Sequence, residues 1–314
     1  ALSANTTAQQ NTALGNVALE DNTTGAFGVA VGSQALRNNT TGGANVGVGC
    51  LALATNTSGT LNTAIGSNTL QANTTASNNT AVGYNALNDN TTGDGNTAVG
   101  SGALDANTTG NYNVGVGLNS LTNIITGSQN VAVGYQALNT STASNNTAVG
   151  YNALVLNTTG TRNVALGSNA LDANTTGDFN TGVGHNSLTA NTTGTLNTSV
   201  GDHSLSANST GARNSALGQS ALFANTTGSD LVAIGERALK ENTTASNNTA
   251  VGSSALKLNT TGSSNTSVGY ESLEANTTGG SNVALGRDAL GSNTTASNNT
   301  GLGRSALGAN TTGT

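Results

Sequence analysis

Residues 79–95 read NTAVGYNALNDNTTGDG and residues 96–112 read NTAVGSGALDANTTGNY, so one 17-residue motif occurs twice in succession. Numbered from its first Asn, the motif is N-T-A-V-G-x-x-A-L-x-A-N-T-T-G-x-x, and eighteen copies follow one another along the 314 residues. Gly at position 5 and Leu at position 9 occur in every copy, and a single residue is missing near 139–141. A fixed short period is typical of solenoid proteins.

Each repeat has the pattern of a β-coil. A unit of 17 residues is too short for the helical pairs of α-solenoids, which take about 34 residues, and its Gly, Asn, Thr and Val content disfavours helix. Thr-Ala-Val alternates with the period of a strand. We predict a strand at positions 1–5, a second short strand near positions 7–10, and an Asn-Thr-Thr-Gly turn.

The glycines at positions 5 and 15 suit turns with positive φ. Four copies have Ala at position 15 followed by Ser-Asn-Asn-Thr, which predicts a different turn type in those copies. The alanines concerned are Ala76, Ala143, Ala245 and Ala296.

The fold class predicted is all-β: a parallel β-solenoid, or β-roll, of about eighteen 17-residue coils that form a single repeat array over residues 1–314. Equivalent residues should stack into ladders along the solenoid. The ladder residues expected include Leu19, Leu36, Leu87, Leu104, Leu154, Leu171, Gly83 and Gly100. Each coil is expected to bury its Leu and its Val-like residue at position 4, worth about 1.5–3 kcal/mol apiece. That core is thin against the ordering cost, which favours association of chains, most simply as a trimer.

Charged residues occupy only six positions of the repeat. All 22 of them stand at positions 6, 7, 10, 11, 16 or 17, which predicts that these six positions face water and that the other eleven are buried, turned or laddered. The net charge of −6 disfavours a nucleic-acid partner. No apolar run is long enough to insert this segment into a membrane.

Catalytic and metal-binding residues are not expected. Catalysis needs converging polar groups, and the only two histidines, His185 at position 6 and His203 at position 7 of the next copy, are expected to point apart. His185 is expected to lie beside Asp202 as part of a solvated surface. The sequence therefore predicts no enzyme activity, no cofactor and no metal site.

Aromatic side chains recur at position 6. This column places Tyr135 next to Tyr151 and Tyr270 beside Arg287, which predicts a stacked aromatic pair and a cation–π pair. Such pairs either pack the surface or contact a carbohydrate.

The Asn-Thr-Thr segments match the Asn-x-Ser/Thr pattern of N-glycosylation. The asparagines either turn the chain beside a threonine ladder or accept glycans on an exposed turn. The candidate acceptors are Asn22, Asn39, Asn73, Asn90, Asn107, Asn157, Asn174, Asn191, Asn225, Asn242, Asn259, Asn276 and Asn293.

The run N-T-A-V-G-x-x-A-L, as in residues 79–87, and the N-T-A-V-G of residues 248–252 resemble a known unit. It is the S-V-A-I-G-x-x-A unit of YadA-type heads in trimeric autotransporter adhesins, and similar units occur in bacterial and phage fibre proteins. The resemblance covers all eighteen copies, although the family unit is nearer 14 residues long. It implies a left-handed parallel β-roll, a homotrimer, an extracellular location at the cell surface and an adhesive role.

The function expected first is therefore an extracellular structural or adhesive fibre, or an adhesin head module, that binds itself as a homotrimer and contacts a host surface or carbohydrate. An alternative is a glycosylated extracellular filament assembled end to end, since open solenoid ends invite stacking. A lesser alternative is an ice-binding protein that presents the threonines of positions 2, 13 and 14.

Overall fold

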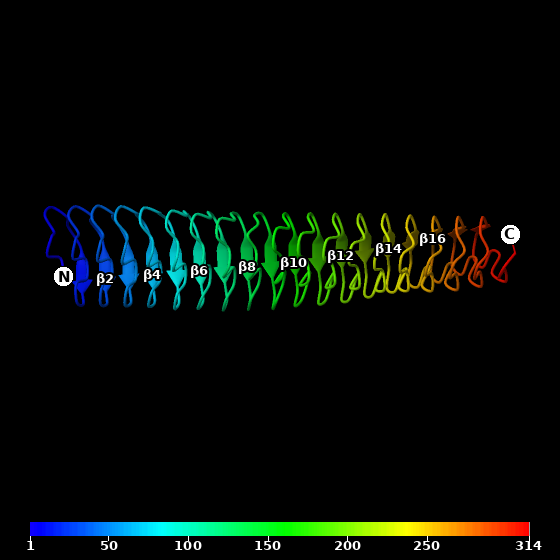
Figure 1. Ribbon diagram of the computed structural model, residues 1–314. Helices are drawn as coiled ribbons and strands as arrows, with labels where there is room; N and C mark the ends of the chain where they lie inside the picture. The colour runs from blue at the N-terminus through cyan, green and yellow to red at the C-terminus, as the bar shows by residue number, and fades with distance from the viewer. Residues whose placement is uncertain (314) are drawn as a thin grey trace. The chain divides into compact units, whose positions relative to one another are not determined.

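The computed structural model describes residues 1–313, which form β-strands and turns. The chain divides into two compact units, Ala1–Thr159 and the part from Gly160 onward. Each unit is a parallel β-solenoid, with one short strand per coil and the coils stacked in chain order (Figure 1). The predicted fold class is confirmed.

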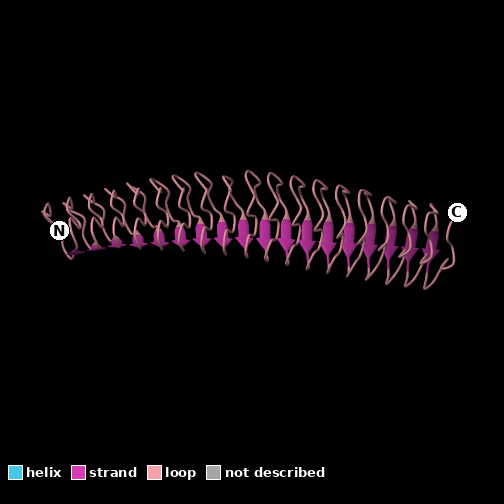
Figure 2. Cartoon of the chain, turned by 60° about the horizontal axis from the view of Figure 1, so that its bottom comes forward, coloured by secondary structure: helices cyan, strands magenta, loops and turns pink. Residues whose placement is uncertain are grey.

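Every strand within residues 1–313 spans three residues, positions 2–4 of the repeat. The first unit contains β1 (Thr12–Leu14), β2 (Val29–Val31), β3 (Val46–Val48), β4 (Thr63–Ile65), β5 (Thr80–Val82), β6 (Thr97–Val99), β7 (Val114–Val116), β8 (Val131–Val133) and β9 (Thr147–Val149). The second unit contains β10 (Val164–Leu166), β11 (Thr181–Val183), β12 (Thr198–Val200), β13 (Ser215–Leu217), β14 (Val232–Ile234), β15 (Thr249–Val251), β16 (Thr266–Val268), β17 (Val283–Leu285) and β18 (Thr300–Leu302). In each unit the strands lie in a row on one side of the coils, and turns make the other sides (Figure 2).

Equivalent residues of successive repeats pair in register. In β5 and β6, Thr80 lies opposite Thr97 and Val82 opposite Val99. The register advances by 16 residues from β8 to β9 because one residue is missing. The hydroxyl of Thr142 donates to the carbonyl of Thr158, as only the position-13 hydroxyl does in other coils, so the missing residue is position 14, directly after Thr142 and next to the predicted stretch 139–141.

Three inward columns of apolar residues fill the thin interior. The Ala of positions 3 and 8 and the Leu of position 9 are buried, as at Ala81, Ala86 and Leu87. A β-carbon at Gly47, a position-3 residue, would lie 3.2 Å from the carbonyl oxygen of Ala52, so a small residue is needed there. The predicted leucine ladder is confirmed at Leu19, Leu36, Leu87, Leu104, Leu154 and Leu171, which are at most 1% exposed. Backbone bonds link neighbouring coils at this column, from the Leu87 N–H to the Ala103 carbonyl.

The predicted second strand is wrong. Positions 6–11 form turns, and positions 7 and 9 have positive φ in all coils, with values of 49° to 55° for the leucines. A left-handed conformation costs a non-glycine residue about 1–2 kcal/mol, which is offset here because the leucine side chains from Leu19 to Leu290 are fully buried. The alternation of left-handed residues turns the chain back toward the strand within a few residues.

The two conserved-looking glycine positions have different roles. At position 5 the prediction of positive φ is confirmed, with 136° at Gly83 and 134° at Gly100. At position 15 it is wrong: Gly59 has no positive φ, and a β-carbon there would lie 2.2 Å from the carbonyl oxygen of Ala76. Close approach of the next coil, and not φ, therefore favours a small residue at position 15.

The predicted alternative turn is not formed by the coils with Ala76, Ala245 and Ala296, which have the same turn pattern as the glycine coils. Positive φ at position 17 is general, since Asn78 has 62° and Leu61 has 58°. In the fourth such coil Ala143 directly follows the missing residue, and only there does the turn pattern differ.

Two buried asparagine columns connect the coils. At position 12 each Nδ2 donates to the Oδ1 of the preceding coil and to the position-15 carbonyl of its own turn, as Asn73 does to Asn56 at 2.8 Å and to Ala76 at 3.1 Å. At position 1 each Oδ1 accepts the backbone N–H of the next coil, as Asn62 does from Asn79 at 3.0 Å. These bonds satisfy buried polar groups that would otherwise be costly.

Candidate functional site

The outward side of each sheet carries two columns of side chains, those of positions 2 and 4. We call this surface the strand face of each unit. Position 4 was expected in the core, but the structure places it on the outside: Ile65 is 42% exposed, Leu217 49% and Leu285 51%. The strand alternates, and because Ala at position 3 points inward, positions 2 and 4 must point outward.

The strand face is uncharged and mostly apolar. Position 4 is Val, Ile or Leu in every coil, and position 2 is Thr, Val or Ser. None of these side chains is buried within residues 1–313, yet none of the 22 charged residues stands among them. Of the expected reasons for a charge-free position, positions 2 and 4 therefore meet only the ladder, since Val82 pairs in register with Val99. An exposed contiguous apolar surface marks an interaction site.

The six charged-type positions lie on the remaining outer surface, together with the threonines of positions 13 and 14, such as the exposed Thr92. Two predicted side-chain pairs are present on this surface. Tyr135 and Tyr151 stack with ring centroids 5.4 Å apart and planes inclined by 10°. The guanidinium of Arg287 lies 5.6 Å from the centroid of the Tyr270 ring. Both pairs lie on the surface and are exposed, where they are open to a ligand with flat apolar faces.

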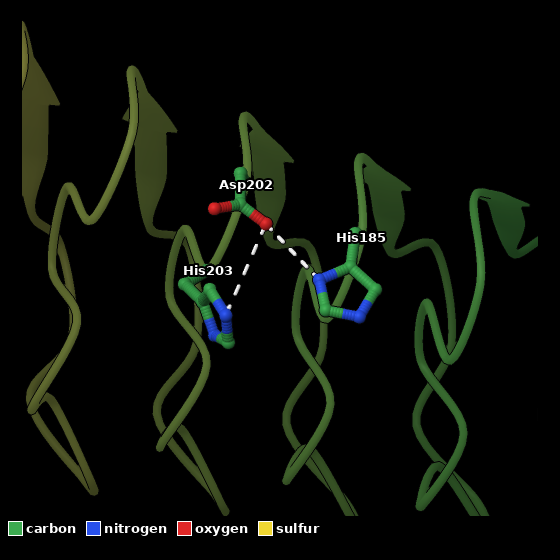
Figure 3. Close-up of side chains that lie close together, drawn as sticks. All are labelled: His185, Asp202 and His203. Carbon is green, nitrogen blue, oxygen red and sulfur yellow. Dashed lines mark hydrogen bonds and ion pairs between the residues drawn. The ribbon is translucent and has the colours of Figure 1, made fainter.

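Three titratable side chains meet on the second unit, at the coils that follow β11 and β12. Asp202 lies between the two histidines (Figure 3). Its Oδ1 is 3.1 Å from Nδ1 of His185 and 3.9 Å from Nε2 of His203. The imidazole rings are edge to face, with centroids 5.3 Å apart. All three side chains are about half exposed.

The expectation for His185 beside Asp202 is confirmed, whereas the expectation that the two histidines point apart is wrong. His203 has a φ of 54°, and this left-handed conformation turns its side chain back over the preceding coil. The backbone N–H of His203 donates to the carbonyl of His185 at 3.0 Å. The sequence did contain a signal for the cluster, because the only two histidines stand in adjacent coils.

The surface also shifts the pKa of three side chains. Two hydrogen bonds from Arg213, at 2.6 and 2.8 Å, lower the pKa of the Asp230 carboxyl. A hydrogen bond with Glu271 raises the pKa of Tyr270. Partial burial, and then the charge of Asp89, raise the pKa of Asp105.

The asparagines proposed as glycan acceptors point into the solenoid. Their Nδ2 atoms, which a glycan would have to replace, lie inside the coil; at Asn90, for example, Nδ2 donates to Asn73 and to Gly93, both at 3.0 Å. All are at most 2% exposed: Asn22, Asn39, Asn73, Asn90, Asn107, Asn157, Asn174, Asn191, Asn225, Asn242, Asn259, Asn276 and Asn293. The folded coil has no room for a glycan at these positions, which corrects that expectation in favour of the structural ladder.

No family model matches the chain, and no curated protein matches it. Within residues 1–313 there is no helix with the length and apolar character needed to cross a membrane.

Proposed function

We propose that the chain is an extracellular fibre or adhesin module whose copies associate through the strand face into a homotrimer. The observation that carries the proposal is the contrast between exposure and charge on this face. Its side chains reach water, yet none is charged, while the neighbouring positions 6 and 7 carry charges of both signs. Covering such a surface is favourable, because it removes apolar side chains from water.

A second copy of the chain is the partner that fits the strand face best. Side chains on it repeat once per coil, about every 4.8 Å, and a periodic surface packs best on one with the same period. Nine strands spaced at about 4.8 Å, each about 10 Å long, give about 430 Å² of flat area per unit. The faces of the two units together give about 860 Å² per copy, which a closed trimer divides between two neighbours, about 430 Å² for each.

The trimer follows from the two columns on the strand face. In a closed ring of three, each copy has two neighbours, and one column can pack against each. Burying nine side chains at position 4 in each unit supplies the apolar area that the thin core of Ala and Leu lacks. The resemblance to trimeric adhesin heads points to the same assembly.

The adhesive role rests on the remaining surface. Positions 6, 7, 10, 11, 16 and 17 vary from coil to coil, unlike the ladder positions, so they can contact a ligand without disturbing the fold. The exposed stack of Tyr135 on Tyr151 suits the apolar face of a sugar ring. A host surface or carbohydrate is the ligand class that we propose for this surface.

The test is the mass of the intact chain in solution by light scattering and sedimentation. Three chains per particle are expected, and Val82→Lys together with Val251→Lys should yield folded monomers because each places a charge in the face of one unit. The matched control is Ser101→Lys with Ser253→Lys, at position 6, which should stay trimeric. A monomeric wild-type chain at about 100 μM, or equal behaviour of the two variants, would refute the interface. Particles that grow with concentration would favour the end-to-end filament instead.

Ice binding is a second candidate that one observation favours. The threonines of position 2, including Thr80 and Thr97, project outward on a flat strand face, in register. They alternate with valines along the column, as at Val114. Thermal hysteresis of the purified chain, lost on Thr97→Lys but not on Ser101→Lys, would support ice binding and contradict the fibre proposal if the chain is also monomeric.

A further inference from the structure

The second unit holds a group of metal-ligating atoms that the fibre proposal does not use. His185, Asp202 and His203 each offer one ligand atom, and these three atoms lie within 4.8 Å of one another. Among residues 1–313 no other trio of His, Cys, Asp or Glu side chains meets this condition. We propose that these three residues bind a divalent first-row transition metal ion, with Zn²⁺ as its representative.

The ligand types select the metal. Imidazole nitrogen and carboxylate oxygen together suit Zn²⁺, Cu²⁺ or Ni²⁺, whereas Ca²⁺ and Mg²⁺ take oxygen ligands. Zinc sites with three protein ligands leave a fourth position for water or another ligand. Here that position would face solvent, because His185, Asp202 and His203 are 54%, 46% and 40% exposed.

The distances are close to those that coordination needs. With metal–ligand bonds of about 2.0–2.2 Å, ligand atoms around a tetrahedral ion lie roughly 3.3–3.5 Å apart. The Oδ1 of Asp202 lies 3.1 Å from Nδ1 of His185 and 3.9 Å from Nε2 of His203. Only rotation of exposed side chains is required, so binding does not have to deform a coil.

The backbone beneath the trio is fixed by the solenoid. Gly201, with a φ of 137°, directs the chain from β12 into Asp202, and the N–H of Gly201 donates to Val183 at 2.8 Å. The N–H of Ser220 in the next coil donates to the carbonyl of Asp202 at 3.0 Å. Coil-to-coil bonds on both sides therefore hold the ligand backbone in place, which is the support that a preorganised site needs.

The placement of the two histidines favours a metal site over a chance distribution of histidines on the surface. The chain has only two histidines, and many exposed positions are available to them along the coils. Both stand on adjacent coils, with a carboxylate between them. The phenyl ring of Phe223 lies beside the imidazole of His203, with ring centroids 6.3 Å apart and planes inclined by 60°.

The experiment is a calorimetric titration of ZnCl₂ into the intact chain near neutral pH, together with imidazole NMR spectra. One Zn²⁺ per chain is expected, and since the chain has two histidines, both imidazole signals should shift together at the same Zn²⁺ concentration. When Co²⁺ is used in place of Zn²⁺, the bound ion should show the visible absorption of nitrogen-ligated Co²⁺. Asp202→Asn and His203→Ala should each weaken binding at least about tenfold, the scale on which lost ligand support reduces metal affinity.

The matched control is Glu236→Gln, which removes one negative charge from the same column two coils farther on. It should change the Zn²⁺ affinity less than about twofold, because charge attraction at that distance is screened. No saturable binding below about 1 mM Zn²⁺, a shift of only one imidazole signal, or an equal loss from Glu236→Gln and Asp202→Asn would each overturn the site. Circular dichroism that is the same for all variants shows that the loss does not come from unfolding.

Discussion

The asparagine column at position 12 is interrupted at one coil, and this interruption leads to a testable prediction. Asn90 takes part in three side-chain hydrogen bonds: it donates to Asn73 and to Gly93, both at 3.0 Å, and accepts from Asn107 at 2.8 Å. Asn107 donates to Asn90 and, at 3.1 Å, to Gly110. The next residue in the column is the buried Ile124, so the Oδ1 of Asn107 is buried without a donor.

The same truncation should therefore cost different amounts in two adjacent coils. Asn90→Ala removes three hydrogen bonds worth about 1 kcal/mol each and leaves the Oδ1 of Asn73 buried without a donor, a total of about 4–6 kcal/mol. Asn107→Ala likewise orphans one oxygen in the preceding coil, but it removes only two bonds and eliminates an existing unsatisfied acceptor. The expected cost is smaller by about 2–4 kcal/mol, which is one hydrogen bond of about 1 kcal/mol plus the penalty of one unsatisfied buried group.

Urea unfolding of both variants measures the difference, with unchanged m-values as the condition for comparison. A double-mutant cycle sharpens it: in an Ile124→Asn background Asn107 gains a donor, so Asn107→Ala should then cost as much as Asn90→Ala. The coupling isolates the hydrogen bond whatever the effect of Ile124→Asn alone. Equal costs in the wild-type background, or no coupling, would refute the assignment of the gap.

Two further predictions concern Asp105 and the glycines. Because burial and then Asp89 raise the pKa of Asp105, the folded chain binds this proton more tightly than the unfolded chain. The resulting stability is full below pH about 4 and is lost as the pH rises through the raised pKa. Asp105→Asn should therefore raise the urea midpoint at pH 7 and should give no such increase below pH 4. A difference in midpoint between the variant and the wild type that does not change with pH would contradict this prediction. Gly100→Ala should unfold its coil or cost several kcal/mol, about 3 or more, because φ is 134° and a β-carbon would lie 2.4 Å from the next coil's carbonyl. Gly102→Asn should change the free energy of unfolding by less than about 0.5 kcal/mol, because Asn stands at this left-handed position in other coils. Equal thermal midpoints for Gly100→Ala and Gly102→Asn would contradict this difference between the two glycines.

The repeat itself determined the coil and its register. Seventeen-residue spacing with Leu at position 9 left one arrangement in which identical side chains lie over one another, and the pairing of Thr80 with Thr97 confirms it. The confinement of charge correctly identified six positions that face water. Both inferences rest on periodicity, which is a property of the sequence and requires no knowledge of the backbone angles.

The tertiary structure decided which uncharged positions are inside. Absence of charge is compatible with a buried side chain and with an exposed apolar side chain, so Leu87 and Val82 could not be distinguished by composition. The backbone separates them, because Leu87 adopts a φ of 51° and turns inward while Val82 lies on the outer side of β5. Left-handed φ at a leucine has no sequence signature, because the residues enriched there besides Gly are Asn, Asp and His. Only the folded coil turned Asn90 into the solenoid and brought His203 over His185.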